Sequence, residues 1–316
     1  MFPLQTHLQM LADKARVAAF RRAIAETVTP GDVVADIGTG TGILALLAVQ
    51  AGARRVYALE WAPILDVARR AARENGYDDR IRFVSGHSME TDLPETVDLL
   101  VTETVGCFAF DEGITAVVED ARRRFLKKNG KVIPQRLALK ALPLGFLQRH
   151  PFGFLHYDFF DLNLGHLQDL AANTAFGLKW YDLEHVRFLA PCQDLMEIDL
   201  RYCSPVRYPL SMSTRFDVST DGLFHGVVVF PEVVLTEEIS IRLLEGETIV
   251  PTHWEFTFFP NRESLQLGVG DRLSFELTVT ADNGFVWQIG HHRNGQDRVF
   301  SHLSLFGHPS LSHLVR

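Results

Sequence analysis

The chain has 316 residues and a net charge of −8 at pH 7, with 47% hydrophobic and 22% charged residues, which is long enough for two domains with real cores. It has no basic stripe for nucleic acid and no run of 18 apolar residues for a membrane span. The acidic balance fits a cationic substrate and, as the ordinary explanation, plain solubility. Three cysteines without a CxxC spacing predict a reduced, cytoplasmic protein without a metal site.

The first 137 residues alternate between helical and strand patterns. Residues 7–28 repeat apolar positions at helical spacing and end before Pro30 and Gly31, so we expect residues 1–30 to be helical. Short apolar strands and helices then alternate over 31–137, which predicts a parallel sheet with helices on both faces. The expected strands are 32–38, 54–60, 80–86, 98–103 and 130–134, and the expected helices are 42–52, 64–76 and 114–126.

The pattern changes after residue 137. Short strands with alternating side chains follow one another, separated by turn residues, and predict an antiparallel β-barrel or sandwich over 138–316. Residues 150–185 are rich in aromatic residues and irregular. The expected strands lie within 207–218, 222–231, 239–246, 253–260 and 271–281.

A glycine-rich turn follows the first expected strand. Residues 34–42 read VADIGTGTG, with Asp36, Gly38 and Gly40, and such a turn lets backbone N–H groups approach a ligand. A dinucleotide fingerprint would need glycine at Ile43. The turn instead resembles motif I of class I S-adenosylmethionine methyltransferases. Glu60 ends the second strand, where a carboxylate can accept ribose hydroxyls, although it could also be a solvated strand end.

A second loop carries two acids around an apolar stretch. Residues 102–113 read TETVGCFAFDEG, with Glu103 and Glu112 nine residues apart. Alone, these acids could be a polar strand end and a helix-start acid stabilised by the helix dipole.

Five motifs in the same order make the chain resemble the protein arginine methyltransferase family. The N-terminal helical run matches the family's cofactor-capping segment at His7, Met10, Leu11, Asp13 and Arg16. LEWAPIL resembles its ribose-binding strand end, GHSMETDLP its adenine-side loop, and TETVGCFAFDEG its double-glutamate loop. PTHWEFTFFP carries the Thr252-His253-Trp254 signature.

The resemblance implies a Rossmann-like domain at 31–137, a β-barrel substrate domain at 138–316 with a helical dimerisation arm at about 150–190, and a homodimer. The alternative is an aromatic segment that packs on its own barrel. The implied cofactor is S-adenosyl-L-methionine. Its implied binding residues are His7, Arg16, Asp36, Gly38, Gly40, Glu60, Ser88, Met89 and Glu103.

The resemblance also implies catalytic and substrate-binding roles. Glu103, Glu112, His253 and Asp13 are the implied catalytic residues, and Glu103, Glu112, Met10 and Trp254 the implied substrate-binding residues. Three alternatives stay open. The His253–Asp13 pair could be a structural latch or help to remove a proton, Arg16 could be a surface arginine, and Met10 could be core.

A guanidinium is protonated below pH ~12 and presents a planar fork of donors, which suits a clamp of two carboxylates. The expected activity is therefore N-methylation of an arginine guanidino group. Thr104, Val105, Cys107 and Met89 depart from the family pattern, only six residues precede His7, and arginine far outnumbers lysine. We take these features to favour a bacterial enzyme acting on free L-arginine or a small guanidine. The alternatives are peptidyl arginine, another amine or hydroxyl acceptor, and a catalytically silent cofactor-binding homologue.

Overall fold

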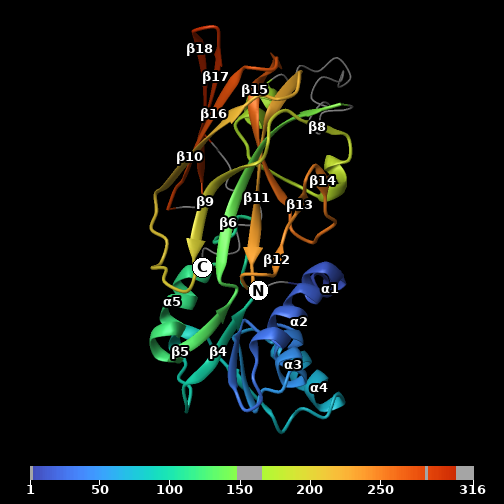
Figure 1. The fold of residues 1–316 in the computed structure, drawn as a ribbon, viewed down its shortest axis with the longest axis vertical. Coiled ribbons are helices and arrows are strands. Elements are labelled where there is room, and N and C mark those ends of the chain that lie inside the picture. The colour runs from blue at the N-terminus through green and yellow to red at the C-terminus, as the bar shows by residue number, and fades with distance from the viewer. Residues whose placement is uncertain (1–2, 148–165, 282–283, 304–316) are drawn as a thin grey trace.

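The computed structural model describes residues 3–147, 166–281 and 284–303, and it has two structural parts (Figure 1). The N-terminal helices and a parallel sheet form one part, and long antiparallel strands form the other. Among the described residues, no helix combines the length and apolar character needed to cross a bilayer.

The N-terminal helical run is two helices, not one. α1 (Leu4–Ala12) and α2 (Lys14–Thr27) are separated by Asp13, whose backbone leaves the helical region at φ −73° and ψ 82°. The Asp13 carboxylate accepts a hydrogen bond from the Arg16 N–H at 3.0 Å and so caps α2. The break occurs at a residue that is neither glycine nor proline.

The parallel sheet has the order β3-β2-β1-β4-β5, and every neighbouring pair is parallel. In Figure 1, α3 (Ile43–Gln50) and α4 (Leu65–Glu74) lie with α2 on one side, and α5 (Ile114–Arg124) lies on the other. This arrangement confirms the Rossmann-like expectation. The strands are β1 (Val33–Ile37), β2 (Arg55–Glu60), β3 (Ile81–Ser85), β4 (Val97–Thr102) and β5 (Leu126–Ile133).

Strand order places the ligand-binding edge of this sheet. The chain moves outward from β1 to β2 and β3, then returns to β4 on the other side of β1. Ligands bind such sheets at the carboxyl ends of the strands, where the order reverses. The glycine turn after β1, Glu60 at the end of β2 and Glu103 after β4 therefore meet at one edge.

The second part consists of antiparallel sheets, as expected. A seven-stranded sheet is built around β6 (Arg136–Phe146), β11 (Gly222–Val234) and β15 (Phe256–Leu267), and it begins slightly before the predicted boundary at 138. A four-stranded sheet has the order β10-β16-β17-β18. The remaining strands are β7 (Phe176–Leu178), β8 (Val186–Phe188), β9 (Gln193–Asp199), β10 (Leu210–Asp217), β12 (Ser240–Ile241), β13 (Leu244–Glu245), β14 (Thr248–Ile249), β16 (Arg272–Val279), β17 (Phe285–Arg293) and β18 (Gln296–Leu303).

The barrel and the dimerisation arm stay predictions. The pairings among the described residues give two separate sheets and the β13–β14 hairpin, without a closing pair. Residues 148–165 of the predicted arm lie outside the described residues. Farther along the arm, after α6 (His166–Ala172), β7 pairs with β15 and β8 pairs with β6, on either side of the short helix η3 (Trp180–Leu183). This portion is therefore part of the sheet.

Candidate active site

The glycine turn after β1 is closely packed. Gly38 and Gly40 have φ values of +72° and +54°, which favour glycine. A Cβ on Gly38 would lie 2.9 Å from the Thr104 methyl group, and a Cβ on Gly40 would lie 3.5 Å from the His7 ring. A side chain at Gly38 would therefore collide with Thr104, and the left-handed backbone at both positions disfavours any other residue.

Glu60 lies against this turn. Its Oε2 accepts a hydrogen bond from the Gly40 N–H at 3.1 Å, and its Oε1 accepts one from the Ala62 N–H at 2.9 Å. The buried His7 ring faces the same turn, and burial lowers the pKa of His7 although the nearby Glu60 charge opposes this. The side chains of α1 and β2 thus meet at the glycine turn.

Asp36 is fully buried at the end of β1. Burial raises its pKa to about 7, and the Glu60 charge adds to this, although hydrogen bonds from the Thr39 hydroxyl and the Ala45 N–H oppose it. Oδ2 accepts from Thr39, while Oδ1 has no partner among the described residues. A buried carboxylate oxygen without a donor is costly and fits a site whose donor belongs to a ligand.

The loop predicted to lie on the adenine side is held by an arginine that sequence analysis missed. Ser88 is buried and Met89 is 44% exposed, in the short helix η1 (Ser88–Glu90). Arg124 on α5 donates to the Ser88 carbonyl at 2.6 Å and to the Thr91 carbonyl at 2.8 Å. Asp120, one turn earlier, fixes the Arg124 guanidinium, and this i, i+4 spacing was the available sequence signal.

Glu103 and Arg16 form a buried ion pair. Arg16 Nη2 lies 2.6 Å from Glu103 Oε2, with the side chains 6% and 7% exposed. Arg16 Nη1 also donates to the carbonyl of the half-buried Met10 at 2.9 Å. The predicted cofactor-binding arginine and the predicted clamp acid are therefore in direct contact.

Glu112 lies in an acidic environment. Burial raises its pKa well above the usual glutamate value, and the charges of Glu103 and Asp111 raise it further, while Arg16 opposes them. Asp111, which sequence analysis did not select, accepts a hydrogen bond from the Phe108 N–H at 3.1 Å, and burial raises its pKa to about 6. The loop therefore brings together three carboxylates.

The apolar stretch between the glutamates anchors this loop. Phe108 packs against Phe285 and Phe259 of the antiparallel sheets, with ring centroids 5.4 and 6.4 Å apart. The Val105 carbonyl accepts a hydrogen bond from the Trp254 indole N–H at 2.8 Å. Trp254 is only 2% exposed, so in this structure it supports the loop, and contact with substrate stays a prediction.

The residues that depart from the family pattern also have packing partners. Cys107 Sγ accepts the Glu255 N–H at 3.4 Å, and the Thr104 hydroxyl lies 3.2 Å from that of Thr102. Val105 is buried. These side chains fill the space between the loop and its neighbours.

Asp13 joins the N-terminal helices to the antiparallel sheets. Its Oδ2 accepts hydrogen bonds from the Thr252 hydroxyl at 2.9 Å and the His253 N–H at 3.1 Å, and lies 2.9 Å from His253 Nδ1. Burial opposes ionisation of Asp13, but the hydrogen bonds from His253, Arg16 and Thr252 prevail and lower its pKa to about 2. The structure thus brings the expected His253–Asp13 pair together.

Known proteins resemble both parts of the chain. The family model described as "Ribosomal protein L11 methyltransferase (PrmA)" matches residues 21–133, which span the parallel sheet. Protein arginine N-methyltransferase 2 of Xenopus tropicalis is 29% identical over 296 residues, covering 90% of this chain and 68% of the relative. Protein arginine N-methyltransferase 6 of the same frog is 25% identical, covering 88% of this chain and 84% of the relative.

Two solved structures share the fold. The Trypanosoma brucei PRMT1 enzyme-prozyme complex with AdoHcy has a TM-score of 0.78 at 20% identity, covering 94% of this chain and 97% of the other. Protein arginine methyltransferase 10 of Arabidopsis thaliana gives a TM-score of 0.77 at 22% identity, with the same coverage.

The fold, the residues around the glycine turn and the relatives together identify the chain as a class I methyltransferase that uses S-adenosylmethionine. Within that class, the chain is an arginine N-methyltransferase, and it is similar over most of its length to protein arginine N-methyltransferases. The comparisons give no support to the expected bacterial enzyme for free arginine, because these relatives are all named for protein arginine.

Proposed function

We propose that the chain transfers a methyl group from S-adenosylmethionine to the guanidino nitrogen of arginine residues in proteins or peptides. The observation that carries this proposal is the meeting of Glu103, Glu112 and Arg16 beside the glycine turn. The small-guanidine substrate expected from the sequence becomes the second candidate.

Local charge supports a peptide over a free amino acid. Three acids, Asp111, Glu255 and Glu112, surround Cys107 in the loop and together raise the pKa of its thiol, after burial. The nearby cations Arg16 and Lys179 are paired with Glu103 and Glu255. A free arginine would bring an α-carboxylate that needs a cation, whereas a basic peptide brings positive charge to an acidic surface.

The residues of the 102–113 loop that differ from the family pattern do not require an unusual substrate. The Thr104 methyl group lies against Gly38, the Val105 side chain is buried, and Cys107 Sγ accepts a hydrogen bond from the Glu255 N–H. Their side chains therefore have structural partners, and the inference from these positions to a small guanidine loses its basis.

The cofactor cradle fits S-adenosylmethionine. His7 and Glu60 lie against the turn at Gly38 and Gly40. Within the described ranges, the buried Asp36 Oδ1 has no donor and the buried Arg16 Nε has no acceptor. When bound there, the cofactor supplies an electrophilic methyl group. We assign Glu60 to its ribose hydroxyls, Arg16 to its carboxylate, and Ser88 and Met89 to the adenine side.

The chain's own residues hold and orient the acceptor. Glu112 and Glu103 accept hydrogen bonds from the guanidinium and attract its charge toward the bound nitrogens, which leaves electron density on the remaining nitrogen. Holding that nitrogen in line can supply about 7–11 kcal/mol of the barrier. The pairing with Asp13 fixes the His253 ring, and we assign His253 to the proton released on methyl transfer.

The test is a methylation assay read by mass spectrometry. An arginine-rich peptide, the same peptide with lysine at each arginine, free L-arginine and buffer alone are compared with equal enzyme. We expect a mass increase on the arginine peptide only. Methylation of free arginine without peptide methylation would contradict the proposed acceptor and select the second candidate.

We further propose self-association, which the aromatic composition of the predicted arm supports. The similar Trypanosoma brucei structure is described as a heterotetrameric complex. Sedimentation at micromolar concentration measures this directly, and a monomeric particle would contradict it.

A further inference from the structure

A pocket that shares no lining residue with the glycine turn is lined by positively charged side chains. It has a volume of about 370 Å³ and lies between the end of α5, strand β5 and the residues after β9. Its lining contains no acidic residue, in a chain of net charge −8. The five cations are Arg122, Lys127, Lys128, Lys131 and Arg201.

Two of these cations are neutralised from outside the pocket. Lys127 Nζ lies 2.7 Å from Asp98 Oδ1, and Arg201 Nη2 lies 2.7 Å from Asp199 Oδ2. Arg201 Nη1 also lies 2.9 Å from Glu237 Oε1. These ion pairs fix the Lys127 and Arg201 side chains and largely neutralise their charges.

The other three have no acidic partner among the described residues. Arg122 Nη1 donates to the carbonyls of Leu200 and Cys203 at 2.9 and 3.2 Å, which fixes the guanidinium without neutralising it. Lys131 reaches only a backbone carbonyl, and no described group pairs with Lys128. A fixed arginine and two exposed lysines thus share one concave surface with uncompensated charge.

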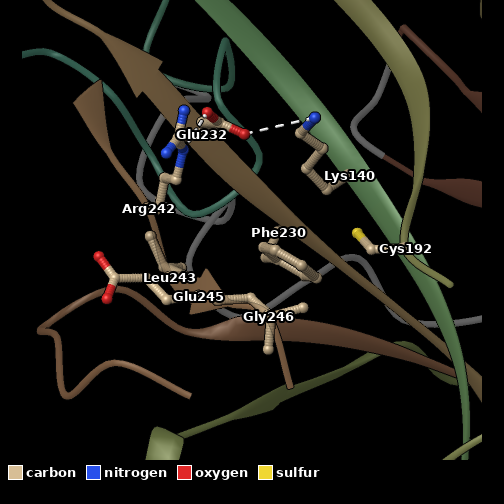
Figure 2. A pocket seen from close by; sticks show the side chains of 9 residues that line it. Lys140, Cys192, Phe230, Glu232, Arg242, Leu243, Glu245 and Gly246 are labelled. Atoms are coloured by element: carbon tan, nitrogen blue, oxygen red, sulfur yellow. Dashed lines mark hydrogen bonds and ion pairs between the residues drawn. The ribbon is translucent and has the colours of Figure 1, made fainter. Parts of the chain in front are cut away.

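A second pocket shows that such charge is not general to this molecule. It has a volume of about 450 Å³, and Figure 2 shows its Lys140 ion-paired with Glu232. Its other cation, Arg242, also pairs with Glu232, at 2.9 Å. That pocket is charge-balanced by residues in its own wall, whereas the basic pocket is not.

We propose that the basic pocket binds a small anion carrying phosphate groups. Phosphate oxygens match both an arginine fork and lysine point charges. The concave shape and the volume suit a small molecule. Tyr202, 79% exposed at the rim, presents its ring beside the Arg201 guanidinium at 5.7 Å and could also carry a nucleotide base. Inorganic polyphosphate and a nucleoside phosphate share this chemistry.

Calorimetric titration of the full chain tests the proposal. The protein is first saturated with S-adenosylhomocysteine, so that adenine nucleotides cannot use the cofactor site, and is then titrated with pyrophosphate, ADP or adenosine at constant ionic strength. The double variant Lys128→Ala/Lys131→Ala removes two exposed charges. The matched control is Arg82→Ala, an exposed cation on β3 at the opposite edge of the same sheet.

We expect single-site binding of pyrophosphate and ADP, weakened about tenfold or more in the double variant and unchanged in Arg82→Ala. Tighter binding of ADP than of pyrophosphate, lost in Tyr202→Ala, would identify a nucleotide; equal affinities would identify inorganic polyphosphate. Three results would each overturn the proposal. These are no binding of either phosphate ligand at low ionic strength, equal weakening in Arg82→Ala, and tighter binding of an oligo-glutamate peptide than of both phosphate ligands.

Discussion

Arg16 Nη2 lies 2.6 Å from Glu103 Oε2, so one arginine connects the proposed cofactor site with the proposed substrate clamp. Replacing Arg16 by alanine should therefore damage both. We expect Arg16→Ala to weaken S-adenosylhomocysteine binding by about 10- to 100-fold, because a charge-assisted pair to a carboxylate is lost. Calorimetry measures this directly. Arg16→Lys keeps the positive charge but not the forked guanidinium, so its S-adenosylhomocysteine affinity should lie between those of the native chain and Arg16→Ala. Native affinity in Arg16→Ala would refute the assignment of Arg16 to cofactor binding.

Glu103 and Glu112, the two proposed clamp acids, should differ in their effects on cofactor binding. Both Glu103→Gln and Glu112→Gln should lower kcat by about 100-fold or more, since each removes a charge that holds the guanidinium. Among the described residues, Glu103 is the one of these two acids that is hydrogen-bonded to Arg16, so Glu103→Gln should change S-adenosylhomocysteine affinity more than Glu112→Gln does. The exposed Glu247→Gln serves as the control for a lost surface acid. Equal cofactor affinity in both clamp variants would show that the ion pair has no role in cofactor binding.

On acidification, activity should begin to fall at a higher pH than it would if it depended on a glutamate with an ordinary pKa. The pKa of Glu112 is raised by burial and by its acidic neighbours, and Glu112 must be ionised to hold a guanidinium. The acidic limb of kcat/KM against pH should follow this group. Asp111→Asn removes one neighbouring charge, so it should lower the pKa of Glu112 and move the limb to lower pH. If the acidic limb of Asp111→Asn coincides with that of the native chain, a group other than Glu112 controls it.

Trp254 should act on catalysis through the loop that it holds. Trp254→Phe keeps an aromatic ring but leaves the buried Val105 carbonyl without its donor, at a cost of about 1–3 kcal/mol. We expect a lower melting temperature and a lower kcat. Trp287→Phe is the matched control, because its buried indole donates to the Pro260 carbonyl and not to the 102–113 loop. The Trp287→Phe variant should lose similar stability and keep its kcat. If its kcat fell as much as that of Trp254→Phe, the effect on catalysis would not be specific to Trp254.

Asp36 should make the apoprotein less stable above neutral pH. Its folded pKa of about 7 exceeds the usual value of 3.8, so the stability it contributes is present below 3.8 and is lost as pH rises through about 7. Asp36→Asn keeps the acceptor for Thr39 and avoids burying a charge. We expect its melting temperature at pH ~8 to be a few degrees above that of the native chain. It should nonetheless bind cofactor more weakly, and a melting temperature unchanged at both pH ~5 and pH ~8 would contradict the titration.

Local sequence patterns predicted the parts of the fold that local forces determine. The apolar runs of β1 and β4 and the turn around Gly38 could be read directly, because burial and backbone freedom leave a clear mark on residue type. The break at Asp13 could not, since it lies in a continuous helical pattern and depends on a cap and on partners in the loop at Thr252 and His253.

Other features depend on contacts between distant segments. β7 and β8 are only three residues long, and they form by adding to the edges of the large sheet. Asp111 stands beside the predicted Glu112, yet its importance arises from burial that only the folded loop creates. The sequence resemblance selected Arg16 and Glu103, which are in direct contact in the structure. It was a weaker guide to the substrate, because the departures at Thr104 and Cys107 have packing partners in the folded protein.

The contact of Asp13 with Thr252 spans 239 residues of chain. During synthesis, the N-terminal helices therefore emerge long before the residues that fasten them. A nascent chain that has produced only the parallel sheet has the cofactor strands but not the loop at 252–254 that secures α1 and α2. We therefore expect a product that terminates before Thr252 to lack methyltransferase activity.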